Sequence, residues 1–479
     1  MAGVLKARDL RKLGLRDSEV QVAARRACRE AARAGLGREA QQEAIRKILA
    51  GPLLLAEHAI WGPLAQLLAA GSRPAPSIAG AADGPSAPRR RGGEAPWRQW
   101  GTDLDPQAVQ QMRDAVSLPV AAAGALMPDA HVGYGLPIGG VLATDGVVIP
   151  YAVGVDIACR MRLTVVDWPA DSLESRREAL REAILRQTRF GAGAAFAAGE
   201  RRDHSVLEAD WAQGPVTRRL RDLAWSQLGT SGSGNHFVEF GRLTLPQPDL
   251  GLAAGVYLAL LSHSGSRRPG LEVADHYARL AAALHRGATG TRRHLAWFDL
   301  RSEPGQEYWA AMQLMGRYAA ANHELIHAAV LGALGARRLA TVENHHNFAW
   351  LETHGGRQVV VHRKGATPAG AGDLGVIPGS MATPGWVVRG LGSAASLRSA
   401  SHGAGRSLSR TEAKRRLRRA EVCELLQRRG VELLGAGLDE APQAYKDITQ
   451  VMAAQADLVQ PIARFDPVLV RMAGGNLTR

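Results

Sequence analysis

The sequence contains only three cysteines among its 479 residues, Cys28, Cys159 and Cys423. Their odd number and wide separation exclude a disulfide framework and favour a reducing compartment. The chain also lacks any apolar run that approaches the roughly 18–20 residues of a membrane span. Its first ten residues, MAGVLKARDL, lack the apolar core of a secretory signal. We therefore expect a soluble, cytoplasmic protein.

Acidic residues are outnumbered, with 45 Asp and Glu against 59 Lys and Arg, so the net charge is +14 at pH 7. Residues 1–100 contribute +8 of this charge, from 17 basic and 9 acidic residues. Residues 406–430 add a second basic block, with 9 basic and 3 acidic residues. Such a charge indicates a polyanionic partner such as nucleic acid. The alternative is a solvated basic surface that binds no particular partner.

The beginning of the chain differs in composition from the rest. Its periodicity predicts helices over residues 17–34, 38–49 and 53–70. The following stretch, 71–96, is rich in Pro, Gly, Ala and Ser and contains three consecutive arginines, which is typical of a linker. We predict a basic helical extension over residues 1–70, this linker, and one large domain over residues 97–479. The extension either helps to hold a nucleic-acid partner or serves as a packing or oligomerisation arm.

Strand-like and helix-like segments alternate irregularly from Trp97 onward. The patterns predict strands over residues 146–150, 160–166, 256–261 and 358–362. They predict helices over residues 171–187, 305–334 and 409–430. Ser409 is a candidate N-cap for the last helix, with Glu412 three residues later. The irregular order favours an α+β fold over a doubly wound sheet.

Several candidate metal ligands stand in Gly-rich or turn-like runs. Asp156 and Cys159 flank a short turn after Gly154. His236 directly follows the run GSGN (232–235), and His263 follows an apolar strand. Asp, Cys and His supply the carboxylate oxygen, thiolate sulfur and imidazole nitrogen that bind metals. Glycine lets the backbone approach an anion closely or adopt positive φ. The pattern predicts a metal site beside a phosphate-bearing ligand.

The adjacent pair His345 and His346 offers one more ligand, because neighbours in an extended segment face opposite ways. His131 is a further candidate, either as a ligand or as a supporting partner together with Asp129. His402 lies in the Gly-flanked run HGAGR without a second carboxylate beside it. A histidine next to metal-bound phosphates is a candidate nucleophile at phosphorus. The run HRKGA (362–366) adds cations suited to phosphate, and the chain has no P-loop motif.

These runs, in this order, resemble the RtcB family of RNA ligases over residues 97–472. The matching segments are MPDAHVGYGLPIGG (127–140), GVDIAC (154–159), LGTSGSGNHFVE (228–239), HSGSR (263–267), HHN (345–347), HRKGA (362–366), IPGSM (377–381), SHGAGRSLSR (401–410) and AYKDITQVMAAQADLV (444–459). The resemblance implies an α+β ligase core that uses GTP and two Mn²⁺ ions. It also implies the joining of an RNA 3′-phosphate or 2′,3′-cyclic phosphate end to a 5′-hydroxyl end. An archease-type activating protein is a further partner that the family suggests.

The resemblance also assigns roles to residues of this chain. The implied metal ligands are Asp156, Cys159, His236, His263 and His346. His402 matches the histidine that becomes guanylylated. The family then transfers this GMP to the RNA 3′-phosphate, which gives an activated RNA end. The implied nucleotide contacts are Asn235, His236, Phe237, Val238, Glu239, His346, Asn347, Pro378, Gly379, Ser380, Met381, His402, Gly403, Ala404 and Gly405.

Two positions depart from the family pattern. Gly385 stands where the family has a serine that contacts the nucleotide, and Arg471 is the approximate substitute for a lysine near the guanine. The metal is a further point of tension, since a thiolate with imidazoles suits zinc or cobalt while the resemblance implies manganese. The alternative function is a metal-dependent phosphoesterase that opens cyclic RNA phosphates without ligation and needs neither His402 nor GTP.

Overall fold

The computed structural model describes residues 5, 9–10, 13, 18–33, 36–50, 60–61, 64, 93–285 and 290–475. The chain divides into two compact units, Met1–Ala87 and Pro88–Arg479. Among the residues described, no helix is both long and apolar enough to cross a membrane.

The smaller unit contains helices α2 (Ser18–Arg33) and α3 (Arg38–Ala50), which confirms two of the predicted helices. Alanine and Cys28 recur on one face of α2 at helical spacing and are buried. They pack in a small core that contains Leu5, Leu10, Ala24, Ala27, Cys28, Ala31, Ile45, Trp61 and Leu64. The predicted helix over 53–70 and linker over 71–96 lie almost entirely outside the described residues. The role of the extension therefore stays a prediction.

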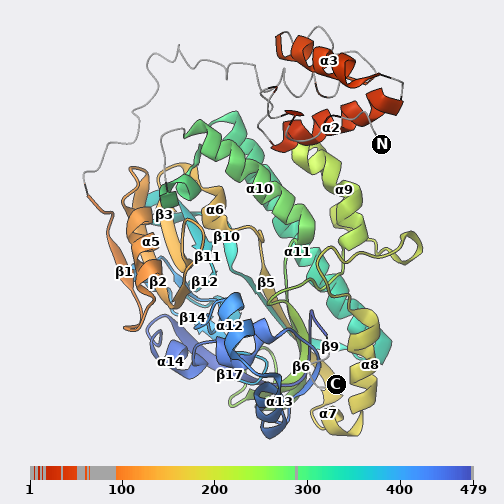
Figure 1. Cartoon of the computed structure of the whole chain (residues 1–479). Coiled ribbons are helices and arrows are strands. Elements are labelled where there is room, and N and C mark those ends of the chain that lie inside the picture. The colour runs from red at the N-terminus through yellow and green to blue at the C-terminus, as the bar shows by residue number, and fades with distance from the viewer. Residues whose placement is uncertain are drawn as a thin grey trace. The chain divides into compact units, whose positions relative to one another are not determined.

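The larger unit contains two main sheets (Figure 1). The larger sheet has the order β13 (Leu374–Ile377), β14 (Gly385–Gly390), β17 (Val459–Met472), β6 (Phe237–Leu245), β7 (Gly255–Ser264), β5 (Arg160–Pro169), β9 (Arg338–His345), with β16 (Glu432–Gly435) beside β17. Its strands are antiparallel except for the β16–β17 pair. The order differs from the sequence order, so segments distant in the chain become neighbours.

The second sheet has the order β1 (Trp97–Gln99), β2 (Ala121–His131), β3 (Ile138–Thr144), β11 (Arg357–Lys364), β10 (Asn347–His354). Two short pairs complete the strands, β12 (Ala366–Pro368) with β15 (Ser399–Ser401) and β4 (Val147–Val148) with β8 (Phe298–Asp299). Only His346 separates β9 of the larger sheet from β10 of the smaller one. This residue therefore lies where the two sheets meet.

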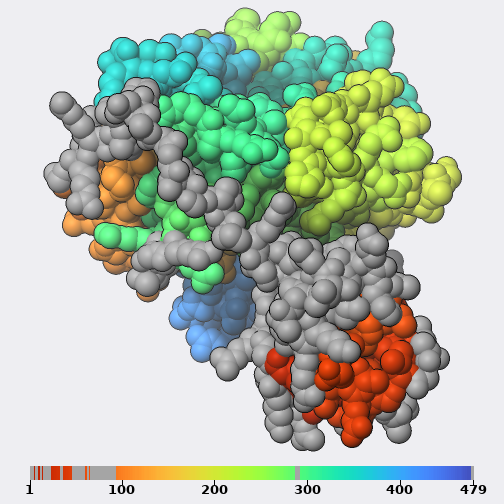
Figure 2. Space-filling model, turned by 90° about the horizontal axis from the view of Figure 1, so that it is seen from above, coloured from red at the N-terminus to blue at the C-terminus, as the bar shows by residue number. Residues whose placement is uncertain are grey.

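Helices cover the sheets on their outer sides. They are α5 (Pro106–Val116), α6 (Pro150–Val153), α7 (Ser172–Ser175), α8 (Arg177–Gln187), α9 (Pro215–Gln227), α10 (Arg267–Leu284), α11 (Glu303–Leu334), α12 (Arg410–Arg416), α13 (Arg419–Arg428) and α14 (Ile448–Ala453). The long α11 packs against α8, α10 and strands β5 and β7. Side chains of α10 (green) and α9 (yellow-green) form much of the face seen in Figure 2. The α+β fold class is thereby confirmed.

Three predicted elements are broken where the backbone leaves its regular conformation. The helix predicted over 171–187 is interrupted at Arg176, whose φ of −126° is not helical. The helix predicted over 409–430 is interrupted at Leu417 and Arg418, both extended, although Ser409 caps it as predicted. The strand predicted over 146–150 ends early because Pro150 starts α6, where its missing N–H costs nothing.

Candidate active site

Four neighbouring strands of the larger sheet end at one edge. Arg160, the first residue of β5, pairs with His345 at the end of β9 and with Ser264 at the end of β7. On the other side of β7, His263 pairs with Phe237, the first residue of β6. The segments that enter or leave these strands therefore meet at this edge. All five residues predicted to bind metal lie in these segments.

Cys159 lies at the centre of the resulting cluster. Its Sγ is 3.3 Å from His236 Nε2 and 3.1 Å from His263 Nε2. His263 Nε2 is 3.2 Å from His346 Nε2, and His236 Nε2 is 2.9 Å from Asp156 Oδ2. The structure thus brings the five side chains together in two pairs, His263 with His346 and His236 with Asp156. The Cys159 sulfur lies between these pairs.

Two glycines make this convergence possible. A Cβ added at Gly265 would lie 2.3 Å from Asp156 Oδ1, and one added at Gly232 would lie 2.4 Å from His236 Nδ1. Gly232 also has a φ of +103°, which L side chains rarely adopt. The glycines of these runs therefore give room to the metal-donor side chains themselves.

Burial and neighbouring charge shift the pKa values of the cluster. Burial raises the pKa of Asp156, but the hydrogen bond and charge of His236 and the charge of Arg267 outweigh it and lower the pKa to about 2. Burial, aided by the His236 charge, lowers the pKa of His263 to about 3. Burial and the Asp156 charge raise the pKa of the Cys159 thiol well above its usual range. The imidazole and the carboxylate are therefore held in their metal-binding forms, whereas the thiol needs a cation beside it to ionise.

This donor set fits a divalent transition-metal ion. One thiol, three imidazole nitrogens and one carboxylate are common ligands of such ions. His263 Nδ1 lies 3.1 Å from the Asn235 carbonyl oxygen, and donation to it leaves the Nε2 lone pair facing Cys159. The ring of His346 is buried without a partner for its Nδ1 among the described residues.

Two other predicted histidines lie outside the cluster. The His345 ring packs 5.0 Å from the rings of Phe348 and Trp350, so the two neighbouring histidines do face opposite ways. His131 Nδ1 lies 3.1 Å from the carbonyl oxygen of Asp129, and the His131 ring lines the cavity described below.

His402 does have a carboxylate partner, which the sequence analysis missed. Asp129 Oδ2 lies 2.7 Å from His402 Nδ1 and also accepts the His402 backbone N–H. Asp129 is fully buried at the end of β2, and its segment is held by Lys446, whose Nζ donates to the carbonyls of Pro128 and Ala130. The carboxylate fixes the ring so that Nε2 is the nitrogen left for chemistry. The His402 ring lies 4.9 Å from the His346 ring of the metal-donor cluster.

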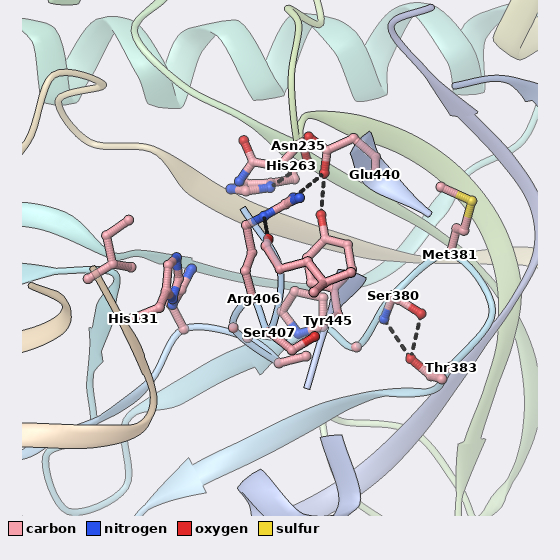
Figure 3. Close-up of a pocket in the computed structure, with 18 of the residues that line it drawn as sticks. His131, Asn235, His263, Ser380, Met381, Thr383, Arg406, Ser407, Glu440 and Tyr445 are labelled. Atoms are coloured by element: carbon pink, nitrogen blue, oxygen red, sulfur yellow. Dashed lines mark hydrogen bonds and ion pairs between the residues drawn. The ribbon is translucent and has the colours of Figure 1, made fainter. Parts of the chain in front are cut away.

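A cavity of about 810 Å³ lies at this edge and includes His402. Figure 3 shows its lining, with Ser380 and Thr383 hydrogen-bonded on one side and Arg406 and Tyr445 turned toward Glu440. Eleven of the predicted nucleotide contacts line it: Asn235, Phe237, Glu239, Pro378, Gly379, Ser380, Met381, His402, Gly403, Ala404 and Gly405. A phosphate-rich ligand in this cavity would have His402 on its wall and the metal-donor cluster beside it.

Comparison with known proteins shows what family this architecture belongs to. The family described as tRNA-splicing ligase RtcB matches residues 111–473. RNA-splicing ligase RtcB of Escherichia coli (strain K12) is 34% identical over 404 residues, which is 77% of this chain and 95% of that protein. RNA-splicing ligase RtcB of Mycobacterium tuberculosis is 33% identical, with 75% and 99% covered. tRNA-splicing ligase RtcB of Thermococcus kodakarensis is 31% identical, with 76% and 92% covered. The chain belongs to the RtcB family.

Two residues matched to nucleotide contacts of the RtcB pattern, Val238 and Asn347, do not line this cavity. Val238 faces the opposite side of β6, where it packs with Phe240 in a buried cluster away from the cavity. Asn347 uses its side chain inside the protein, since Nδ2 donates to the Asp156 carbonyl and Oδ1 accepts the Gly365 N–H. Asn347 thus ties the metal-donor turn to the HRKGA run, and Val238 supports the strand.

The position of Arg471 differs from the one expected from the sequence. Arg471 was expected to stand in for the RtcB lysine, but it points out of the cavity. Its Nη1 donates to the carbonyls of Ile184, Leu185 and Thr188, and its guanidinium stacks on Phe190. Strand alternation on β17 places the neighbours Val470 and Met472 on the cavity side instead.

The Glu239 end of the cavity, made of Glu239, Leu261, Val470 and Met472, therefore contains one carboxyl among apolar side chains. Glu239 is 5% exposed, and burial raises its pKa to about 8. No described residue forms a hydrogen bond or ion pair with this carboxyl. Gly385 also lines the cavity, and a Cβ there would lie 3.2 Å from Pro378 Cα, so a larger residue would need a small shift.

Cations of the cavity wall are already paired with acids. Arg406 donates to Glu440 and to the Asp439 carbonyl, and Arg410 pairs with both acidic side chains. Tyr445 donates its hydroxyl proton to Glu440 (Figure 3). A phosphate entering here would compete with Glu440 for the two arginines.

Proposed function

We propose that this protein is an RNA ligase that uses GTP and Mn²⁺ to join RNA 3′-phosphate or 2′,3′-cyclic phosphate ends to 5′-hydroxyl ends. The observation that carries the proposal is the Asp129–His402 pair beside the five-residue metal-donor cluster. A metal site alone would serve many phosphate reactions. A carboxylate-held histidine on the wall of the same cavity is suited to nucleophilic attack.

The His263–His346 pair and the His236–Asp156 pair, together with Cys159, would hold two divalent ions. Bound ions would neutralise charge on the phosphates and on the leaving group. The proposal requires Cys159 as a free thiol, as it is here, and a reducing compartment such as the cytoplasm. Manganese follows the family, and zinc is expected to compete because of the thiolate.

In the first step, His402 attacks the α-phosphorus of GTP through Nε2. Donation of the Nδ1 proton to Asp129 keeps the ring in the tautomer whose lone pair is on Nε2. The new N–P bond forms as the bond to pyrophosphate breaks, and pyrophosphate leaves. The product is GMP linked to His402.

The RNA then takes this GMP. An oxygen of the 3′-phosphate attacks the phosphorus on His402, which frees the imidazole and leaves an RNA end capped by GMP through a pyrophosphate bond. The 5′-hydroxyl of the second strand attacks the RNA phosphorus, and GMP departs as the phosphodiester forms. A cyclic end must first be opened by water.

Guanine is proposed to lie at the Glu239 end of the cavity. Guanine offers two neighbouring N–H donors, at N1 and N2, which adenine does not, and these donors would stabilise the ionised form of the Glu239 carboxyl. Tyr445 and the Pro378–Met381 loop contribute the surrounding walls. RNA is the macromolecular partner, and an archease-type activator remains part of the proposal.

Labelling with GTP radioactive at the α-phosphate, in the presence of Mn²⁺ and without RNA, tests the proposal. We expect wild-type protein to acquire a covalent label and His402→Ala to acquire none. His204→Ala is the matched control, because His204 lines a different cavity and should label normally.

The alternative phosphoesterase needs neither GTP nor His402. Cyclic-phosphate opening that survives in His402→Ala, together with no label on metal-loaded wild-type protein, would favour that alternative and reject the ligase.

A further inference from the structure

An exposed aromatic side chain lies at the rim of the cavity and has no part in the chemistry above. Tyr134 is 68% exposed, on the loop between β2 and β3, and Val132 on the same loop is 41% exposed. Both residues line the cavity that contains His402. Large exposed apolar side chains beside a reactive site commonly mark a binding surface.

The Tyr134 ring and its loop contact the segment that contains His294. The His294 ring stands edge-on to Tyr134 at 5.8 Å and to Tyr151 at 4.9 Å. Gly135 has a φ of +73°, and a Cβ there would lie 2.7 Å from the His294 carbonyl oxygen, so the loop packs closely on this segment. The backbone that carries the ring is thus held against the His294 segment, which reduces the entropy cost of stacking on the ring.

Basic side chains lie next to His294 in the sequence and at the Tyr134 backbone. Arg292 and Arg293 are exposed beside His294, and neither has an ion-pair partner among the described residues. Lys364 of the HRKGA run is 7% exposed and donates Nζ to the Tyr134 carbonyl at 2.5 Å, with no carboxylate partner in the described part of the chain. Burial lowers the pKa of Lys364 to about 7, so a phosphate beside its Nζ would favour the charged form.

The path from this surface to the metal-donor cluster is short. A Cβ added at Gly154, two residues before Asp156, would lie 3.8 Å from Lys364 Cε. Aromatic rings flanked by unpaired cations are the usual means of holding single-stranded nucleic acid, because every base has a face to stack and every linkage carries a negative charge.

We propose that Tyr134, His294, Arg292 and Arg293 form a stacking platform for an unpaired base of an RNA end, whose adjoining phosphate lies toward Lys364. We call these four residues the Tyr134 platform. The inference rests on the proposed ligase function and adds where the RNA end is held. It predicts sequence-tolerant binding that requires at least one unpaired terminal nucleotide.

The experiment compares wild type, Tyr134→Ala and Tyr134→Trp in binding two single-stranded RNAs, one with a 3′-phosphate end and one with a 5′-hydroxyl end. The terminal base of each is replaced by 2-aminopurine, whose fluorescence falls on stacking. We expect Tyr134→Ala to raise Kd for one of the two strands about fivefold or more and to abolish the quenching. Tyr134→Trp should retain both within about twofold.

Trp225→Ala is the matched control, an exposed aromatic at a different cavity, and it should bind RNA as wild type does. Weakened binding of only one strand assigns the platform to that end. Unchanged binding of both strands overturns the platform. Loss of GTP labelling in Tyr134→Ala also overturns it, since Tyr134 would then belong to the nucleotide site. Labelling of the wild type reports separately on the ligase proposal.

Discussion

The two ends of the cavity are built on the same strands, but their functional groups are fixed in different ways. At the metal-donor end, four side chains converge around the fifth, Cys159, and they are crowded enough to require Gly232 and Gly265. At the Glu239 end, one buried carboxyl stands among apolar neighbours and has no partner among the residues that the structure describes. The first end is specified by many mutually dependent contacts, and the second by a single group.

This difference implies different tolerances. Removing one donor from a shared metal cluster disturbs the binding of the metal by all the other donors. Substitutions there should therefore abolish activity almost completely. Changes at the Glu239 end should alter which nucleotide is preferred and how tightly it binds. His402 lies between the two ends. Loss of its contact with Asp129 should therefore reduce activity by an intermediate amount.

The largest effect is expected from Cys159→Ala, because the thiol is shared by both proposed metal positions. Loss of a Lewis-acid contribution of several kcal/mol corresponds to a fall of about 10³-fold or more in the rate of His402 labelling. Metal content per protein, measured by elemental analysis, should fall in parallel. Cys423→Ala, a thiol outside the site, should retain both. A labelled, metal-loaded Cys159→Ala protein would refute the shared position.

Next in size is Asp129→Asn. The amide can donate to His402 Nδ1, which favours the tautomer with its proton on Nε2 and removes the attacking lone pair. We expect the labelling rate to fall by about 10²–10⁴-fold while metal content stays at the wild-type value. A fall of less than threefold would show that the carboxylate does not set the tautomer.

Much of the metal-donor end could be predicted from the sequence. Asp156, Cys159, His236 and His263 stand in or beside short runs that contain glycine, and His346 stands in the run NHHN. These runs lie at strand ends that one sheet brings together. The long helix α11 was equally clear, because its pattern continues for many turns. Asp129 was missed as the partner of His402 because 273 positions separate the two residues and no local pattern joins them.

The Glu239 end could not be predicted for a different reason. The pairing of β17 with β6 shifts its register between Pro467 and Leu469. A shift of one residue exchanges the two faces of a strand, so alternation counted along the sequence does not tell which side Arg471 takes. The structure places it outward.

A smaller effect is expected from Glu239→Gln on nucleotide binding. The amide still accepts one hydrogen bond, but it presents an N–H to a guanine N–H and loses the charge. We expect KM for GTP in the labelling reaction to rise about 10–100-fold, with less change in kcat and a lower preference for GTP over ATP. Equal GTP and ATP discrimination in the variant and the wild type would remove Glu239 from base recognition.

The same substitution changes the pH dependence of stability. Burial raises the pKa of Glu239 to about 8, above the value of about 4.5 expected in the unfolded chain. Between these values the folded protein holds a proton that the unfolded chain releases, so this group makes stability fall as pH rises from about 5 to 8. Urea unfolding at both ends of this range should show a smaller fall for Glu239→Gln than for the wild type.

The smallest effect on activity is expected from Arg471→Ala, and Met472→Ala is the variant with which it is compared. Arg471→Ala removes hydrogen bonds to the carbonyls of Ile184, Leu185 and Thr188, so stability should fall by about 1–3 kcal/mol. KM for GTP should stay within about twofold, since the guanidinium lies outside the cavity. Met472→Ala removes a cavity-lining side chain and should raise KM more than Arg471→Ala does. The reverse order in KM would mean that the guanidinium turns into the cavity when the nucleotide binds, and the contrast between the two ends would then be weaker than the structure indicates.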